Sequence, residues 1–415
     1  MSGSRLKPGG CGIYAGWSVV GLGFLLQFIA SGPVYYAFGS YAPSLANAFD
    51  VPRTLINLAY SMVVFIGAVG SAPVGWLIDR LPVRGLTLLG LGGTALGLGL
   101  AGMATAYWQV LLLFGTLIAA SEAFIGNLTV NYLISHWFER RRGLAIGLAV
   151  IGASAAAIVF PPLASALVEG VGWRMTLIAF GTGMACLLIP AWFLARIPPD
   201  IPEIERKPGS RDHGAAKPRR FEARELVRDP AFWIVVLCSG SMIGINGAVM
   251  ITMVPYAVNL GYSSLQGATF LSMVGVGAMA GKLGFGLVAD RIDLCWAQRL
   301  GLCLMIAGLF LLMTGAGHVG ILAASVVYGL ALGGMMPVWG ALVAHIYGLG
   351  SYGTILGYSR AAMTPITIVC PLVAGAAFDF TGTYQAAWTC FMILLLLSLA
   401  ATFLFRGWSR AFVDR

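Results

Sequence analysis

Two short stretches of the chain, GWLIDR at residues 75–80 and GLVADR at residues 286–291, share the pattern G-x-x-x-D-R. Each stretch closes an apolar run that is long enough to cross a bilayer. Each also falls after the second such run in its own half of the chain. A pattern that returns at the same place in both halves indicates an internal repeat, so we expect two halves of similar architecture.

The composition around these stretches is that of a membrane protein. Of the 415 residues, 59% are hydrophobic and 10% are charged, whereas soluble domains are about one quarter charged. A span needs about 20 mostly apolar residues and must be helical to satisfy its backbone in lipid. We therefore predict an all-α membrane protein with twelve transmembrane helices. The predicted spans are approximately residues 17–41, 55–78, 86–104, 110–133, 143–167, 175–194, 231–260, 268–288, 300–316, 319–346, 353–378 and 386–405.

The longest polar interruption runs from residue 196 to residue 229 and is rich in proline and mixed charges. These features are typical of a linker. We predict an N-terminal six-helix bundle over residues 1–195, a cytoplasmic linker over residues 196–229 and a C-terminal six-helix bundle over residues 230–415. Gly277-x-x-x-Gly281 and Gly67-x-x-x-Ser71-x-x-x-Gly75 are predicted to allow close contacts between helices.

The basic residues predict the orientation in the membrane. Most of the 25 lysines and arginines fall on one side if the N-terminus is cytoplasmic, and the outer loops then hold only Arg53 and Arg174. The positive-inside rule therefore places both termini in the cytoplasm of a multi-pass protein of the cell (inner) membrane. This topology accounts for the net charge of +9, so we expect no nucleic-acid partner. The seven cysteines show no metal-binding spacing, and we expect no metal and no cofactor.

The repeated loops, together with WFERRRGLAIG at residues 137–147, resemble the signatures of the major facilitator superfamily. The resemblance implies two pseudo-symmetric six-helix halves. It also implies that the loop residues bridge cytoplasmic helix ends as parts of a gate, although they could be simple interfacial anchors. The gate residues implied in this way are Gly75, Asp79, Arg80, Arg141, Gly286, Asp290 and Arg291.

Segments of the first and seventh spans, residues 32–42 and 250–257, resemble the oxalate/formate antiporter and monocarboxylate transporter families. The fifth-span signature of drug exporters, G-P-x-x-G-G, is absent, and the chain reads VFPPL at residues 159–163 instead. This departure disfavours a drug or metabolite exporter of the same fold, which stays the alternative. No arrangement of nucleophile and base suggests an enzyme.

Three ionisable side chains lie inside predicted spans: Lys282, Arg360 and Glu122. Such a residue costs about 2.5–3.5 kcal/mol at the centre of a membrane helix, and it usually faces a cavity or a partner. Lys282 and Arg360 each lie about 12 Å inside the cytoplasmic end of their spans. Lys282 could instead snorkel, Arg360 could bond to carbonyls, and Glu122 could be a fixed counter-ion or a protonated carboxyl.

The family resemblance implies that cations of the eighth and eleventh helices hold substrate carboxylates. We assign Arg360 the principal clamp and Lys282 a second charge. Other candidate ligands are Tyr35, Tyr36, Asn127, Asn246 and Tyr328, each of which could equally be a packing residue. Glu122 is our candidate for proton coupling.

These residues predict a secondary active transporter of small organic anions, mono- or dicarboxylates, that works by alternating access. If the two cations stay uncompensated in the empty site, closing it is costly and the carrier exchanges anions. If Glu122 pairs with them, empty return and proton symport follow. The expected partners are the organic anion, a proton in the symport case and membrane lipid, with the monomer as the working unit.

Overall fold

The computed structural model describes residues 15–78, 80–138, 141–196, 223–288, 293–314, 317–347 and 352–404. Within these ranges the chain is helical and contains no strand, as the sequence predicts. The N-terminal half comprises α1 (Ala15–Ser31), η1 (Gly32–Tyr36), α2 (Phe38–Phe49), α3 (Arg53–Ile78), α4 (Val83–Gly102), α5 (Tyr107–Leu112), η2 (Leu113–Ile118), α6 (Ala119–Ile125), α7 (Asn127–Ser135), α8 (Arg142–Cys186) and α9 (Leu188–Leu194). The C-terminal half comprises α10 (Ala223–Arg228), α11 (Pro230–Asn259), α12 (Ser264–Val288), α13 (Leu294–Met313), α14 (Gly317–Tyr347), α15 (Tyr352–Thr381) and α16 (Gln385–Leu404).

Eleven stretches of the described residues are long and apolar enough to cross a membrane. One of them, Leu144–Leu194, has 51 residues and is long enough for two crossings. Within it, Gly172 has φ 80°, a left-handed value that breaks the helix, so α8 is two helices joined at a kink. The described residues thus supply the predicted twelve spans, with the fifth and sixth joined at Gly172.

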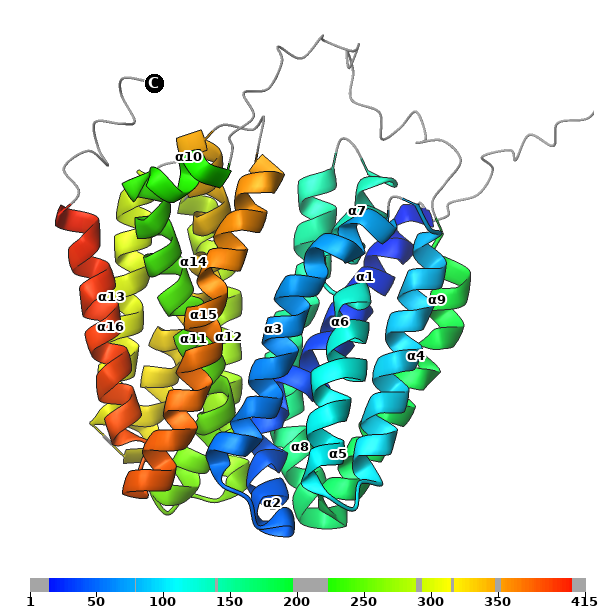
Figure 1. Ribbon diagram of the computed structural model, residues 1–415, viewed down its shortest axis with the longest axis vertical. Coiled ribbons are helices and arrows are strands. Elements are labelled where there is room, and N and C mark those ends of the chain that lie inside the picture. The colour runs from blue at the N-terminus through cyan, green and yellow to red at the C-terminus, as the bar shows by residue number, and fades with distance from the viewer. Residues whose placement is uncertain are drawn as a thin grey trace, which may run out of the picture.

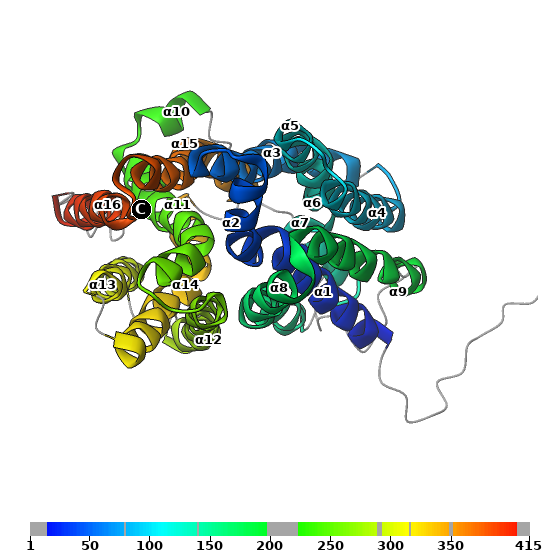
Figure 2. The ribbon, with the colours of Figure 1, turned by 90° about the horizontal axis from the view of Figure 1, so that it is seen from below.

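The spans form two bundles, each with its own apolar core. One large buried cluster is built from α1 to α9, and another from α11 to α16. Figures 1 and 2 show the two groups of helices side by side. The halves meet where α3 packs on α15, α8 on α12, and α2 on α11. These are the contacts between the halves that position the candidate site.

Glycines allow close contact within the C-terminal half, as the Gly277 motif predicts. A Cβ at Gly277 would lie 2.3 Å from the carbonyl oxygen of Val326, and one at Gly281 would lie 2.3 Å from that of Leu330. Helices α12 and α14 therefore touch backbone to backbone. At Gly67 a Cβ would meet nothing within 4 Å, so this position makes no close helix contact, and the close packing predicted for the rest of that motif stays a prediction.

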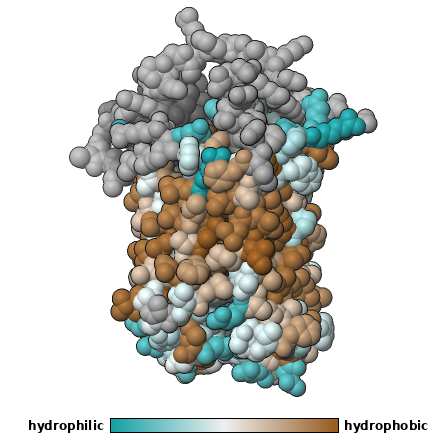
Figure 3. Space-filling model, turned by 90° about the vertical axis from the view of Figure 1, so that its left-hand side faces the viewer, coloured by the Kyte–Doolittle hydropathy of each residue, from teal (hydrophilic) through white to brown (hydrophobic). Residues whose placement is uncertain are grey.

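The start of α1 and the end of α16 lie at the same end of the molecule, which we call the termini end (Figure 1). The opposite end, where α3 begins and α15 ends, is called the far end. Figure 3 shows a broad hydrophobic band around the middle of the visible side, with hydrophilic residues gathered towards the far end. A band of this kind is the surface that a bilayer requires.

Candidate functional site

The first span is interrupted by a π-helical segment, and this segment carries two of the candidate ligands. Residues Gly32–Tyr36 form η1, in which the backbone N–H of Ala37 donates to the carbonyl of Gly32 at 2.8 Å. Gly32 is required here, because a Cβ would lie 2.3 Å from the Phe160 ring of α8. Such π-segments are rare and occur frequently at functional sites. Tyr35 and Tyr36 thus lie on the irregular part of the first span.

The fourth span is interrupted as well. After α6 the backbone of Gly126 turns to ψ −173°, and a new helix, α7, begins at Asn127. Glu122 lies in the last turn before the break, and Asn127 is the first residue after it. Discontinuous helices of transporters commonly form the binding site. Glu122 and Asn127 therefore lie on the two sides of one break.

The Glu122 carboxyl is buried in the N-terminal half, with 5% of the residue exposed. Its Oε1 atom has no hydrogen-bond partner among the described residues. The Thr94 hydroxyl of α4 lies 3.0 Å from the carbonyl of Gly90 and is also a hydrogen-bonding neighbour of the Glu122 carboxyl. Since a hydroxyl has a single hydrogen, the Gly90 carbonyl and the Glu122 carboxyl compete for it. The carboxyl is not fixed in an ion pair with a described residue.

Arg360 faces the N-terminal half from α15. Its Nη1 atom is buried and has no partner among the described residues. Tyr35 lies within electrostatic range of both the Arg360 guanidinium and the Glu122 carboxyl. The structure therefore brings Arg360, Tyr35 and Glu122 into one electrostatic neighbourhood that spans both halves.

Lys282 connects the halves directly. Its Nζ atom donates to the Ser154 hydroxyl of α8 at 2.7 Å. At the same interface, the Ser272 hydroxyl of α12 donates at 2.7 Å to the carbonyl of Ile158, which lies one turn after Ser154 on α8. The Lys282 ammonium thus has a protein partner in the other half of the molecule.

The remaining candidates are distributed between the interface and the core. Tyr36 packs against the apolar cores of both halves. Asn246 lies on α11 beside Gly247, which approaches the Tyr60 ring of α3, and its Oδ1 atom has no partner among the described residues. Tyr328, in contrast, is fully buried in the core of the C-terminal half, and its hydroxyl lacks a described partner.

Two polar residues beside the candidates were not singled out from the sequence. The Gln27 side chain donates to Oδ1 of Asn127 at 2.5 Å, and Ser154 receives Lys282. Gln27 has a sequence signal, because it is the lone amide of an otherwise apolar span. Ser154 has none, because small hydroxyl residues are frequent in membrane helices and usually serve packing.

The far end of the molecule is closed by contacts between α3 and α15. The Asp379 carboxylate accepts hydrogen bonds from the backbone N–H groups of Arg53 and Thr54, both at 2.9 Å, and from the Thr54 hydroxyl at 2.5 Å. An acidic residue of one half thereby caps the first turn of a helix of the other. Further inside, Asn57 donates to the carbonyl of Pro371 at 2.9 Å and Ser61 to that of Ile368 at 3.2 Å.

Arg53 makes further contacts between the halves at the far end. Its guanidinium lies over the Phe378 ring, 4.5 Å from the centroid, and donates to the Tyr384 hydroxyl at 3.1 Å. Burial raises the pKa of Tyr384, while the neighbouring Arg53 acts in the opposite direction. The hydroxyl thus stays neutral and accepts the hydrogen bond. These contacts, like those of Asp379, bind the two halves together at the far end.

Four of the predicted gate residues are described, and these lie at the termini end. The helical backbone includes Gly75 and Gly286, and the side chains of Arg80 and Arg141 are exposed. Asp79, Asp290 and Arg291 lie outside the described residues. Their role as a gate stays a prediction.

Twelve spans in two halves, with ionisable side chains held in the membrane where the halves meet, define a membrane transporter. The model of the Major Facilitator Superfamily matches residues 23–319. The chain therefore belongs to the Major Facilitator Superfamily, as its loops predict, and it is a transporter rather than an enzyme.

Individual relatives resemble the chain over most of its length. It is 26% identical to Monocarboxylate transporter 11 of Homo sapiens, covering 95% of this chain and 83% of the relative. It is also 26% identical to the MFS-type transporter pynF of Aspergillus niger, covering 80% of this chain and 74% of the relative. A solved bacterial homologue of the human lysosomal transporter Spinster, in an inward-facing and unoccupied conformation, matches with a TM-score of 0.78. This match has 16% identity and covers 98% of this chain and 99% of the other.

Proposed function

We propose that this transporter carries small organic anions, mono- or dicarboxylates, by secondary active transport with alternating access. The observation that carries the proposal is the buried Arg360 guanidinium, whose Nη1 atom has no partner among the described residues. A buried guanidinium N–H group left without an acceptor in the membrane is costly. A carboxylate offers the planar, two-oxygen partner that its donors fit.

The other charged groups extend this site. Lys282 supplies a second positive charge from α12, held against Ser154 when no substrate competes for it. A monocarboxylate can bind Arg360 alone, whereas a dicarboxylate can engage both cations. Tyr35, Tyr36, Asn127 and Asn246 are proposed as the polar surroundings of the bound anion. Tyr328 is proposed only as a support for these residues, because its side chain lies in the core.

Glu122 is the proposed proton carrier. Its buried carboxyl has an unpartnered oxygen and shares the neighbourhood of Tyr35 with Arg360. An ionised Glu122 would partly balance the two cations in the empty site, and it would take up a proton when the substrate carboxylate arrives. The proposed transport mode is therefore proton symport. Anion exchange follows instead if the empty site cannot return.

The orientation belongs to the same proposal. We place the termini end in the cytoplasm and the protein in the cell membrane, because most of the basic residues outside the spans fall on that side. The described contacts between the halves that involve Asp379, Asn57 and Ser61 then close the outer side. The gate loops around Gly75 and Gly286 are proposed to close the inner side in the opposite state.

The test is uptake of labelled mono- and dicarboxylates into proteoliposomes by the unchanged protein and by Arg360→Gln. We expect Arg360→Gln to lower carboxylate uptake by two orders of magnitude or more, because one of the strongest ligands of the anion is lost. Arg174→Gln, at the far end, is the matched control and should retain uptake. If Arg360→Gln transports carboxylates normally, the proposal fails. Transport of cationic compounds by both the unchanged protein and Arg360→Gln would instead favour the alternative, a drug or metabolite exporter of the same fold.

A further inference from the structure

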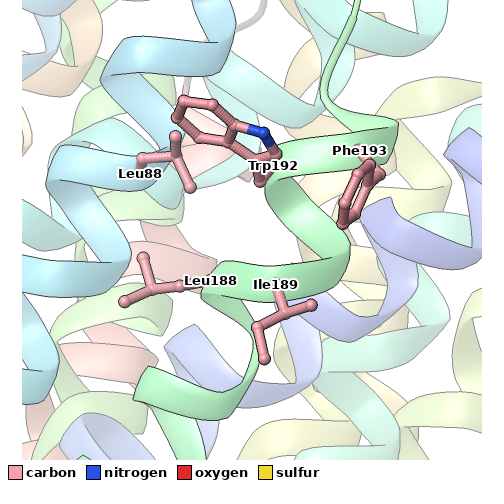
Figure 4. A pocket seen from close by; sticks show the side chains of 5 residues that line it. All are labelled: Leu88, Leu188, Ile189, Trp192 and Phe193. Carbon is pink, nitrogen blue, oxygen red and sulfur yellow. The ribbon is translucent and has the colours of Figure 1, made fainter.

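An apolar groove opens on the outer face of the N-terminal half, away from the site between the halves. It is lined by Leu88 of α4 and by Leu188, Ile189, Trp192 and Phe193 of α9, and its volume is about 400 Å³. Figure 4 shows Leu88 on one helix facing Leu188 and Trp192 on the other. Ile189 and Phe193 are 67% and 62% exposed, so the groove faces the surroundings of the bundle. In a membrane these surroundings are lipid.

A cation lies at the termini end of this groove. Arg84, one turn before Leu88 on α4, places its guanidinium carbon 3.5 Å from the centroid of the Trp192 ring. Its Nε atom is buried and has no partner among the described residues. Arg196, just after α9, is exposed at the same end, and its backbone carbonyl is held by the indole N–H of Trp137 at 2.7 Å. The Arg84 guanidinium thus lies at the end of the groove, and a second arginine, Arg196, follows α9 at the same end.

The C-terminal half contains a comparable arginine, Arg299, which also stacks on an aromatic ring but has hydrogen-bond acceptors in the protein. On α13, Arg299 lies over the Phe403 ring of α16, 4.3 Å from the centroid. There Nε donates to the Thr402 hydroxyl at 3.2 Å and Nη2 to the Thr402 carbonyl at 2.9 Å. No hydroxyl or carbonyl among the described residues does this for Nε of Arg84. Within the described ranges, the stacked arginine of the N-terminal half therefore lacks the protein acceptors that Arg299 has, and its side chain is only half-buried.

We propose that this groove binds an anionic phospholipid of the leaflet at the termini end. The phosphate of the headgroup accepts hydrogen bonds from Arg84, Arg196 adds positive charge, and an acyl chain lies along Leu88, Leu188 and Trp192. The guanidinium fits phosphate oxygens because its donors are fixed in one plane. The indole fits the boundary between headgroups and chains. The apolar groove and the cation at its end match the two parts of a single lipid molecule.

Native mass spectrometry of the full chain tests the proposal, with phosphatidylglycerol and phosphatidylcholine added in turn to detergent-purified protein. We expect the unchanged protein to prefer phosphatidylglycerol. Arg84→Gln should lower that preference about fivefold, which corresponds to the contribution of one arginine near a charged lipid surface. Arg174→Gln is the matched control: its guanidinium also stacks on an indole, Trp173, at 4.3 Å, but at the far end. It should keep the preference.

A second variant separates the chain-binding part from the headgroup-binding part. Leu88→Trp fills the groove and leaves Arg84 in place. It should weaken binding of long-chain phosphatidylglycerol and leave a dihexanoyl analogue unaffected. If Arg84→Gln does not fold, the lipid preferences of Arg84→Lys and Leu88→Trp are compared with that of the unchanged protein. Lysine retains the positive charge but lacks the planar set of donors of a guanidinium. Equal binding of the two headgroups by the unchanged protein would overturn the proposal. Equal losses in Arg84→Gln and Arg174→Gln would also overturn it.

Discussion

The Glu122 carboxyl has two neighbours that bear on its role, the hydroxyl of Thr94 and the phenol of Tyr35. If Glu122 carries the proton, Glu122→Gln removes the titrating group and keeps the shape of the side chain. We expect this variant to lose uptake driven by a pH gradient and to retain exchange of labelled for unlabelled carboxylate. Both are measured on the same proteoliposomes. Loss of exchange together with driven uptake would assign Glu122 a structural role instead.

The contact of Lys282 with Ser154 predicts opposite effects for its two partners. Lys282→Ala removes a charge that binds substrate, and should weaken dicarboxylate binding. Ser154→Ala removes a hydroxyl that competes with substrate for the ammonium, and should tighten binding about fivefold, since a hydrogen bond contributes about 1 kcal/mol. Isothermal titration with a dicarboxylate measures both. Ser165→Ala on the same helix, which loses only a hydrogen bond to Ser40 within one half, should leave affinity unchanged. Weakening by Ser154→Ala would contradict this account.

At the scale of residues, the sequence identified the charged groups better than their partners. Lys282, Arg360 and Glu122 stand out because a charge inside an apolar run has few explanations. Ser154 and Asp379 do not stand out, since serine is common in membrane helices and an aspartate near a span end is ordinary. Their roles depend on which helix of the other half lies opposite, and this is a tertiary property with no local pattern.

At the scale of elements, apolar length predicted the spans but not their interruptions. The run that contains Leu144–Leu194 divides at Gly172, and the first and fourth spans contain π-segments. Gly126 breaks the fourth span with a φ of −69°, a value open to every residue. Composition alone does not distinguish this glycine from those inside regular helices, because 56 glycines occur in the chain. The break is a consequence of packing.

The close contact between α12 and α14 should make a larger residue at Gly277 destabilising. In Gly277→Ala the new methyl group would lie 2.3 Å from the carbonyl oxygen of Val326, and backbone cannot move aside as a side chain can. We expect a loss of about 1–3 kcal/mol in stability, the usual cost of overpacking. Thermal unfolding followed in detergent measures it. Gly284→Ala on the same helix meets nothing within 4 Å and should unfold like the unchanged protein. Similar unfolding temperatures for the two variants would disprove close contact.

At the scale of the whole molecule, the two halves were predictable because the repeated G-x-x-x-D-R pattern marks corresponding places in each. Which end of the molecule is closed was not predictable, because the same sequence must form one conformation with the far end closed and another with the far end open. The structure has the far end closed through Asp379, Asn57 and Ser61. The sequence therefore defined the repeated architecture, while the contacts between the halves had to come from the structure.

The closed far end predicts that Asp379 controls the balance between conformations. Asp379→Asn removes the charge that caps the first turn of α3 from the opposite half. A hydrogen bond to a charged group contributes about 1.5–3 kcal/mol, so the equilibrium should shift roughly tenfold or more towards an open far end. Spin labels at Ala48→Cys and Thr383→Cys, in a background without the seven native cysteines, report the separation of the halves. We expect a new population at longer distance.

The matched control is Asp293→Asn. Asp293 also caps a helix, accepting from the backbone N–H of Cys295 at 2.8 Å, but the capped helix α13 belongs to its own half. Removing this charge should lower thermal stability slightly and leave the distance distribution unchanged, because both states of the transporter contain the same cap. A longer distance in both variants would mean that loosening either half opens the far end. A longer distance in Asp379→Asn alone would identify the cap between the halves as the contact that holds the far end closed.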